Sequence, residues 1–193
     1  MAESHKDLPV VTFASDVEWE AWLREHGEVS GAIWVKFAKK GNSESSLTKV
    51  EAVRTALCWG WIDGQLGSWD EAWFITRFTR RGPRSNWSQV NVGHVEDLER
   101  LGRMQAQGRA QVDQAKADGR WESAYSPPSS KRVPPELQAA LDESPCAWAA
   151  FEALNSANRF AMCYRIEVAK RQETKLRHAA SFVVMLEEGK QNH

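Results

Sequence analysis

The sequence predicts an α+β fold, in which a mainly antiparallel sheet packs with helices and is followed by a small all-helical module. Two observations indicate the mixed class. Two strand-like runs are joined by a tight turn near residue 70, whereas the earlier strand-like runs are separated by helical ones. In addition, every apolar pattern after residue 135 has the period of a helix, so we expect the C-terminal part to contain no strand.

The first part of the chain alternates strands with helices. Ser15 is placed as the N-cap of a helix with Gly27 beyond its end, and Thr48 with Glu51 forms a capping box. Asp63-Gly64 is expected to be a bulge within a longer strand, because too few strand residues precede it for a hairpin turn. The predicted order is strand 9–13, helix 15–27, strand 31–40, helix 49–60, and strands 61–69 and 72–80.

A helical pattern begins at Ser88. Gly108 is predicted to break this helix, and a second helix is expected to run to about Gly119. The apolar residues that recur at intervals of three or four are Val92, Val95, Leu98, Leu101 and Met104.

The segment SPPSSKRVPP is the clearest linker in the chain, because it is rich in Pro and Ser and poor in apolar residues. Helices are expected to begin at Pro135, at Ser144-Pro145, after Ser156 as an N-cap and after Thr174 as another. The predicted domains are an α+β domain over residues 1–125, the linker over 126–135 and a helical module over 136–193.

Composition indicates a globular, cytosolic protein. The 193 residues are 42% hydrophobic and carry a net charge of −1, so any attraction to nucleic acid has to be local. Ten tryptophans are far more than average, and most of them must lie in the core. The three cysteines lack the spacing of a disulfide framework or a zinc site, and no segment is apolar enough to span a membrane.

The stretch FITRFTRRGPRSNWS (residues 74–88) is the strongest candidate for a functional site. Gly82-Pro83 forces a turn that can fold the arginines together, and guanidinium groups suit phosphate or carboxylate. Trp87 offers a ring for stacking, and Ser88 opens a helix whose free N–H groups favour anions. The alternative is that the arginines pair with nearby acids as ordinary surface ion pairs. The predicted ligand-binding residues are Arg77, Arg80, Arg81, Arg84, Ser85, Trp87, Trp61 and Asp63.

Asp63 is the candidate acid for catalysis. It stands between Ile62 and Gly64 after a Trp-Gly-Trp run, so we expect it to be partly buried and paired with an arginine of the next strand. A structural ion pair and a catalytic acid both fit this position.

Other chemistry has less support from the sequence. The histidines are scattered without metal-ligand spacing, and no phosphate-binding loop or nucleophile elbow occurs, so no catalytic residue, cofactor or metal site is assigned. Cys58 is expected to be a buried structural thiol. The acidic face of the first helix fits weak iron binding through oxygen ligands or an ordinary solvated face. Its acids are Asp16, Glu18, Glu20 and Glu25.

Several blocks of the chain resemble the YdeI/OmpD-associated, or bacteriocin-protection, family. They are EAVRTALCWGWIDGQ, RFTRRGPRSNWSQVN, LGRM, AKADGRWESAY and NRFAMCYRIEVAKRQETKLRHAASFVVMLEEGK. The resemblance implies the YjbR/CyaY-like superfamily, with a frataxin-like N-terminal part built on a twisted antiparallel sheet, and tolerance of bacteriocins or antimicrobial peptides. It supplies no catalytic residues. The family has FTPRR where this chain has FTRRGPR, which makes the loop more cationic here.

The function expected from the sequence is therefore that of a non-enzymatic, cytosolic bacterial binding protein. Its partner would be an anionic ligand, either nucleic acid or a compound bearing phosphate or carboxylate, held by the arginine and tryptophan residues of the stretch. Two alternatives stay open. One is an enzyme that uses Asp63 in a Trp-lined pocket, and the other is an iron chaperone of the frataxin-like type.

Overall fold

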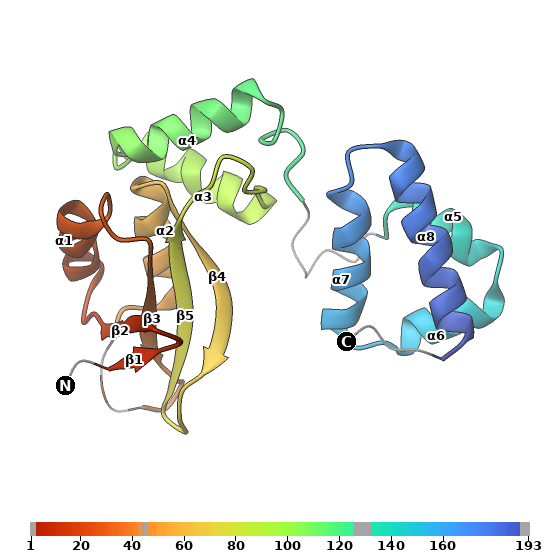
Figure 1. Cartoon of the computed structure of the whole chain (residues 1–193), viewed down its shortest axis with the longest axis horizontal. Coiled ribbons are helices and arrows are strands. Elements are labelled where there is room, and N and C mark those ends of the chain that lie inside the picture. The colour runs from red at the N-terminus through yellow and green to blue at the C-terminus, as the bar shows by residue number, and fades with distance from the viewer. Residues whose placement is uncertain (1–2, 43, 45, 126–132, 190–193) are drawn as a thin grey trace. The chain divides into compact units, whose positions relative to one another are not determined.

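The computed structural model describes residues 3–42, 44, 46–125 and 133–189. The chain divides into two compact units (Figure 1). The N-terminal unit comprises Met1–Ser85 and Asn91–Glu122, and the C-terminal unit comprises Asn86–Val90 and Ser123–His193. Most of the predicted linker, residues 126–132, lies outside the described residues, so the domain boundaries drawn from the sequence stay a prediction.

The N-terminal unit is built on a five-stranded sheet of order β1-β2-β3-β5-β4. Only the β2–β3 pair is parallel, and the sheet is otherwise antiparallel, as predicted. The register of β4 on β5 shifts between Asp63 and Leu66, which confirms the bulge expected at this position. The strands are β1 (Ser4–His5), β2 (Leu8–Thr12), β3 (Ala32–Ala38), β4 (Trp61–Ser68) and β5 (Trp73–Arg80).

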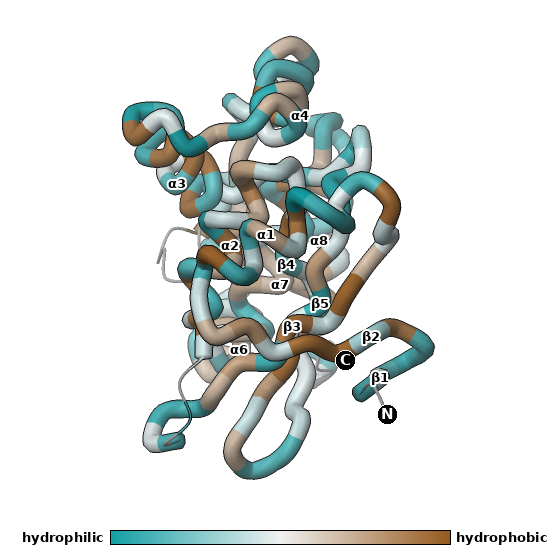
Figure 2. The backbone as a smooth tube through the Cα atoms, turned by 90° about the vertical axis from the view of Figure 1, so that its left-hand side faces the viewer, coloured by the Kyte–Doolittle hydropathy of each residue, from teal (hydrophilic) through white to brown (hydrophobic). Residues whose placement is uncertain are grey.

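The sequence analysis did not predict β1, which pairs with β2 at the edge of the sheet. It is hydrophilic in Figure 2, whereas β3, inside the sheet, is largely hydrophobic. Two residues cannot show the apolar alternation by which a strand is recognised.

Helices α1 (Asp16–His26) and α2 (Lys49–Cys58) pack against one face of the sheet. The ring of Trp19 lies edge-on to that of Phe78 on β5, with 5.5 Å between centroids, and its indole N–H donates to the carbonyl of Ala52 at 3.0 Å. Trp19 is completely buried. The indole therefore joins sheet, α1 and α2 while satisfying its one polar atom.

The chain reverses between α3 (Gln89–Arg100) and α4 (Ala106–Ala117) at Gly102, not at Gly108 as predicted. Gly102 has a φ of +67°, and the N–H of Arg103 donates to the carbonyl of Leu98 at 2.9 Å. This is the Schellman geometry, which needs a residue that adopts the left-handed conformation without strain. Gly108 lies inside α4, where it has a packing role instead.

The C-terminal unit contains α5 (Pro135–Asp142), α6 (Pro145–Ala153), α7 (Ser156–Glu167) and α8 (Gln172–Glu187) around one apolar core. The N-caps of α7 and α8 are Asn155 and Arg171, each earlier than predicted. The fully or almost fully buried residues of this core are Leu137, Leu141, Ala147, Phe151, Met162, Ile166, Ala179, Phe182 and Leu186. The α+β class, with a sheet followed by helices, is confirmed.

Candidate ligand-binding site

The N-terminal unit holds a pocket of about 330 Å³ where α1, α2 and β5 end and α4 begins. Its lining residues include arginines, a glutamate, glutamines and a tryptophan. The described residues that line it are Leu23, Gly27, Glu28, Trp59, Gly60, Arg80, Arg81, Gln107, Ala110 and Gln111.

Two consecutive arginines reach this pocket, although consecutive strand residues normally point to opposite faces. Arg80 is the last residue of β5, and Arg81 already lies beyond the strand, where its N–H donates to the carbonyl of Gly60 at 2.9 Å. The guanidinium of Arg80 donates to the carbonyl of Glu28 at 2.6 Å. Arg81 is buried, with 6% of its surface exposed, so its charge is withdrawn from bulk solvent.

The opposite wall is formed by one face of α4. Gln107 and Gln111 are one turn apart, and the carboxamide of Gln107 donates to the carboxylate of Glu28 at 2.9 Å. Gly60 has a φ of +73°, and a Cβ at this position would lie 3.0 Å from the carbonyl oxygen of Gln107. Gly60 therefore permits both the turn after α2 and the close approach of α4.

Two residues that line the pocket each carry a buried polar atom without a hydrogen-bond partner among the described residues. These atoms are the indole nitrogen of Trp59, a donor, and the side-chain oxygen of Gln111, an acceptor. The guanidinium carbon of Arg24 also lies 6.0 Å from the centre of the Trp59 ring. Leaving such an atom unpaired costs about 1–3 kcal/mol, so both would gain from a partner.

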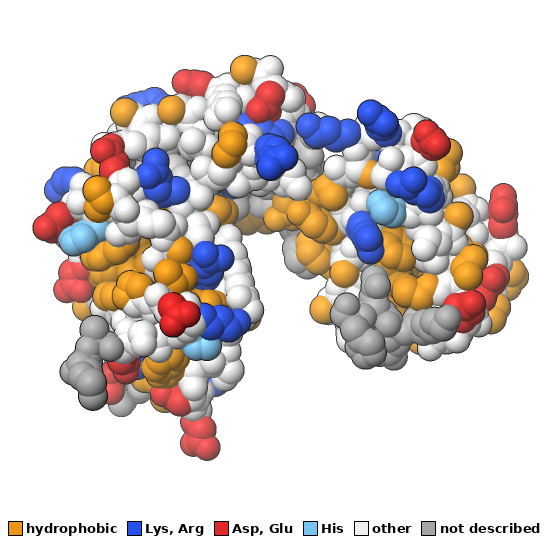
Figure 3. All heavy atoms as spheres, viewed as in Figure 1, with side chains coloured by type: hydrophobic (Ala, Val, Ile, Leu, Met, Phe, Trp, Pro, Cys, Tyr) orange, Lys and Arg blue, Asp and Glu red, His pale blue; other side chains and the backbone are white. Residues whose placement is uncertain are grey.

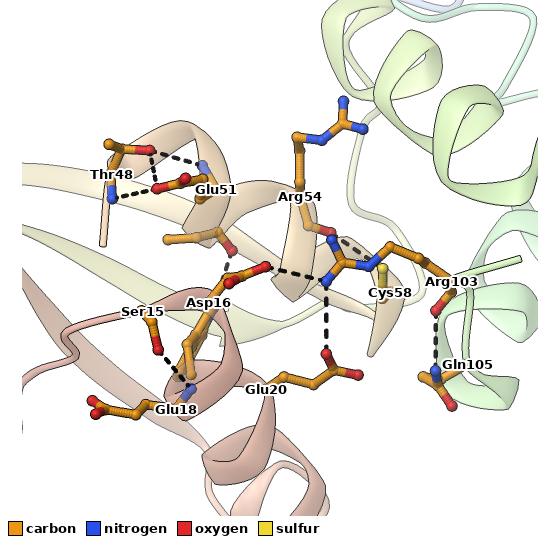
Figure 4. A network of polar contacts seen from close by, with 12 residues as sticks. Ser15, Asp16, Glu18, Glu20, Thr48, Glu51, Arg54, Cys58, Arg103 and Gln105 are labelled. Atoms are coloured by element: carbon orange, nitrogen blue, oxygen red, sulfur yellow. Dashed lines mark hydrogen bonds and ion pairs between the residues drawn. The ribbon is translucent and has the colours of Figure 1, made fainter. Parts of the chain in front are cut away.

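Polar contacts join the start of α4 to α1 and α2 (Figure 4). Arg103, just before α4, lies between two carboxylates of α1, at 3.5 Å from Asp16 and 3.6 Å from Glu20. The N–H of Gln105 donates to the carbonyl of Cys58 at 3.1 Å. Burial raises the pKa of the Cys58 thiol to about 11, so the thiol stays protonated, as expected for a structural cysteine.

The same network bears on the iron hypothesis. Asp16 and Glu20 are two acids of the α1 face. The guanidinium of Arg103 lies between their carboxylates and occupies the position that a metal ion bound by both would take. Within the described part of the chain, no group of three or more His, Cys, Asp or Glu side chains is arranged to hold a metal ion.

The structure places only two of the eight predicted ligand-binding residues, Arg80 and Arg81, at the pocket. Arg77 and Arg84 are exposed and form no ion pair with a described residue. Ser85 serves the turn, where its hydroxyl accepts from the N–H of Gly82 at 3.1 Å.

The two predicted tryptophans are buried side chains. Trp61 is 1% exposed and donates to the carbonyl of Gly27 at 3.1 Å, and Trp87 is 2% exposed and falls in the C-terminal unit. Neither ring is open for stacking on a ligand, because burial leaves no free face.

Asp63 has a lysine partner, not the arginine expected from the next strand. Its carboxylate lies 3.1 Å from the ammonium of Lys49 at the start of α2. Asp63 is not among the described residues that line the pocket, so the structural ion pair accounts for its position.

The sequence analysis missed the polar residues of α4 and the segment after α1. Gln107, Gln111 and Glu28 stand in stretches that are typical of a solvated surface, and no local pattern separates them from other polar residues. One signal was available: Gly60 stands at the end of the predicted helix 49–60, where a glycine commonly takes a positive φ and ends the helix.

Comparison with known families also divides the chain into an N-terminal and a C-terminal part. Residues 11–111, slightly more than half of the chain, match the model of a family described as Domain of unknown function (DUF8412). The chain belongs to this family. All described residues that line the pocket fall within the matched range, so the pocket is a feature of the DUF8412 part.

Residues 132–189 match a second model, described as Bacteriocin-protection, YdeI or OmpD-Associated. This match confirms the predicted resemblance for the helical C-terminal residues, whereas the N-terminal blocks of that resemblance fall in the DUF8412 range. No curated protein and no solved structure matches the chain significantly. None of the described helices is both long and apolar enough to cross a membrane.

Proposed function

We propose that this DUF8412 protein is a binding protein that holds a small anionic molecule in the pocket at the ends of α1, α2 and β5. The observation that carries the proposal is the convergence of Arg80 and Arg81 on one pocket, opposite the carboxamides of Gln107 and Gln111. Guanidinium groups match the geometry of carboxylate and phosphate oxygens, and a low-dielectric wall strengthens such contacts.

The size of the pocket favours a small molecule over nucleic acid. A volume of about 330 Å³ lies at the lower end of the range of ligand pockets, which is about 300–1,000 Å³. Single-stranded nucleic acid needs exposed aromatic rings for stacking. The one aromatic ring among the described lining residues is the half-buried indole of Trp59, which has the Arg24 guanidinium 6.0 Å from its centre, and Trp61 and Trp87 are buried. The proposed ligand is therefore a compact carboxylate- or phosphate-bearing compound with further hydrogen-bonding groups.

The unpaired atoms beside the pocket support a ligand with both donors and acceptors. A ligand acceptor would pair with the indole N–H of Trp59, and a ligand donor would pair with the side-chain oxygen of Gln111 after small side-chain rotations. The carboxylate of Glu28 is the only acidic group among the described lining residues, and it already accepts from Gln107. Non-covalent binding accounts for this set of groups without a catalytic step.

A purely structural role for Arg80 is the competing explanation. Its guanidinium satisfies the carbonyl of Glu28 just after α1, where a cation complements the helix dipole. The two roles differ in a measurable way, because only ligand binding makes the stability of the protein depend on an added anion.

Thermal unfolding with added inorganic phosphate, citrate or adenosine monophosphate tests the proposal. A bound anion at about 100 times its Kd stabilises by about 2.7 kcal/mol. For a chain of this size, that gain raises Tm by about 5–10 °C. Arg80→Gln removes a charge-assisted contact, and we expect the Kd of that anion to rise by about 10- to 100-fold.

Arg77→Gln is the matched control, since Arg77 is an exposed arginine of the same strand that does not line the pocket. It removes the same charge and should leave the Kd within about twofold. Equal weakening by both substitutions would indicate general charge attraction. The proposal would be wrong if none of the three anions raised Tm, or if Arg80→Gln bound as tightly as the unchanged protein.

The broader context follows from the C-terminal match. Because residues 132–189 match a bacteriocin-protection family, we propose that ligand binding in the N-terminal unit serves tolerance of such peptides. A cytosolic location is also proposed, and the three free cysteines, Cys58, Cys146 and Cys163, are compatible with a reducing compartment. The frataxin-like superfamily suggested by the sequence remains a prediction.

A further inference from the structure

The end of the C-terminal unit at which α7 passes into α8 concentrates positive charge. Residues 165–178 contain five lysines and arginines against two acids, although the whole chain has a net charge of −1. Figure 3 shows Lys, Arg and His side chains gathered over this end. We call the five cations and the leucine among them the α7–α8 surface: Arg165, Lys170, Arg171, Lys175, Leu176 and Arg177.

These cations are largely not neutralised by neighbouring acids. Lys175 lies 3.8 Å from the carboxylate of Glu136, whereas the other four form no ion pair with any described residue. Burial lowers the pKa of His178, and the charges of Arg165 and Arg177 lower it further, so both guanidinium groups act on the same imidazole. Their mutual repulsion in the free protein would be relieved by an anionic partner.

Most acids of the C-terminal unit lie elsewhere. Four lie on or next to α5 and α6, of which Glu136 reaches Lys175, and two more lie at the far end of α8. An anionic surface would therefore be attracted to the α7–α8 connection and repelled from the opposite end of α8. These acids are Glu136, Asp142, Glu143, Glu152, Glu187 and Glu188.

An exposed apolar side chain occurs in the same turn of α8 as two of these cations. Leu176 is 52% exposed, and it stands between Lys175 and Arg177 in the sequence. Over the described residues, no aromatic ring is among the large apolar side chains that are exposed, so base stacking has no platform here. Cations with an apolar residue between them are typical of proteins that bind the interface of an anionic bilayer.

We propose that the α7–α8 surface binds peripherally to anionic lipid membranes, with Leu176 entering the headgroup region and the surrounding cations contacting lipid phosphates. This interaction is independent of the pocket in the N-terminal unit. Each lysine or arginine near an anionic membrane contributes about 1 kcal/mol, or roughly a fivefold change in partition coefficient.

Vesicle flotation with the full-length protein tests the proposal. The vesicles contain phosphatidylcholine alone or with about one third phosphatidylglycerol, at about 0.1 M salt. We expect binding only to the anionic vesicles. Arg165→Gln with Arg177→Gln should lower the partition coefficient by about 25-fold, and Leu176→Ser should lower it by about tenfold.

Arg77→Gln with Arg84→Gln is the control, because it removes the same charge from two exposed arginines of the N-terminal unit. It should leave the partition coefficient within about twofold. Unchanged circular dichroism and Tm would show that every variant folds.

Three outcomes would overturn the proposal. The first is equal flotation with both kinds of vesicle, and the second is an equal loss in the control. The third is binding to a thymidine oligonucleotide that depends on Arg165 and Arg177 but not on Leu176, which would identify nucleic acid as the partner.

Discussion

Replacing Gly108 with alanine tests whether α4 packs against the end of α2 as closely as the structure has it. A Cβ at Gly108 would lie 2.2 Å from the carbonyl oxygen of Cys58 and 2.6 Å from that of Leu57. Both contacts are with backbone, so no side-chain rotation can relieve them. One helix has to move by roughly 1 Å, and overpacking of this kind costs about 1–3 kcal/mol.

Two further effects contribute to the net change in the free energy of unfolding. Alanine favours the helix interior over glycine by about 1 kcal/mol, which offsets part of the cost. Movement of α4 also weakens the hydrogen bond from Gln105 to the carbonyl of Cys58, which contributes about 1 kcal/mol. We therefore expect Gly108→Ala to lower the free energy of unfolding by about 1–3 kcal/mol.

Gly93→Ala is the matched control. Gly93 also lies inside a helix, α3, but a Cβ there would meet no atom within 4 Å. The same substitution should therefore stabilise the protein by about 0.5–1 kcal/mol.

Urea unfolding followed by tryptophan fluorescence measures both variants against the unchanged protein, because buried tryptophans such as Trp19 and Trp61 belong to the N-terminal unit. The two variants should differ by about 1.5–4 kcal/mol in the free energy of unfolding, with opposite signs relative to the parent. An unfolding midpoint for Gly108→Ala equal to or above that of Gly93→Ala would refute the close approach of α2 and α4.

Three other predictions follow from single contacts. Thr48→Ala should destabilise the protein by about 1 kcal/mol in urea unfolding, because it removes the N-cap of α2. The substitution should also raise the pKa of Glu51, because hydrogen bonds from the side chain and the backbone of Thr48 lower that pKa. An unchanged pKa of Glu51 would count against this prediction. His94 has a pKa lowered by burial and by Arg54, so the unfolded chain takes up its proton more readily. Stability should therefore fall as the pH drops below about 6.5, the ordinary value, and the fall should be smaller in His94→Gln at the same pH. Iodoacetamide should modify the exposed Cys146 first, since burial raises the pKa of both Cys58 and Cys163 to about 11, and mass spectrometry of the labelled peptides would detect any other order.

The sequence predicted the elements of the N-terminal unit well because their signals are local. Apolar alternation predicted β3, and a capping box predicted the start of α2 within one residue. The position at which the helical pattern after Ser88 breaks was harder to predict, because Gly102 and Gly108 both interrupt the same apolar pattern. Only the backbone geometry distinguishes the glycine that takes a positive φ from the glycine against which a neighbouring helix packs.

The candidate site was predicted less well because it depends on contacts between distant segments. The tryptophan content indicated that most indoles are core residues, and Trp61 and Trp87 follow that rule instead of forming a stacking surface. Arg80 and Arg81 were among the residues predicted for the site, and both line the pocket. Gln107 and Gln111 were not, since a glutamine on a helix gives no sign of which element it faces.

The pocket follows from the way the ends of its elements are satisfied. The carbonyls of Gly27 and Glu28, beyond the end of α1, accept from Trp61 and Arg80, and the carbonyl of Gly60 accepts from the N–H of Arg81. The bonds from Arg80 and Arg81 hold the end of β5 against the ends of α1 and α2, and the bond from Trp61 does the same for the start of β4. Two successive arginines therefore line one pocket. A ligand anion would therefore meet cations already held in place by the fold, so little side-chain entropy would remain to be lost on binding.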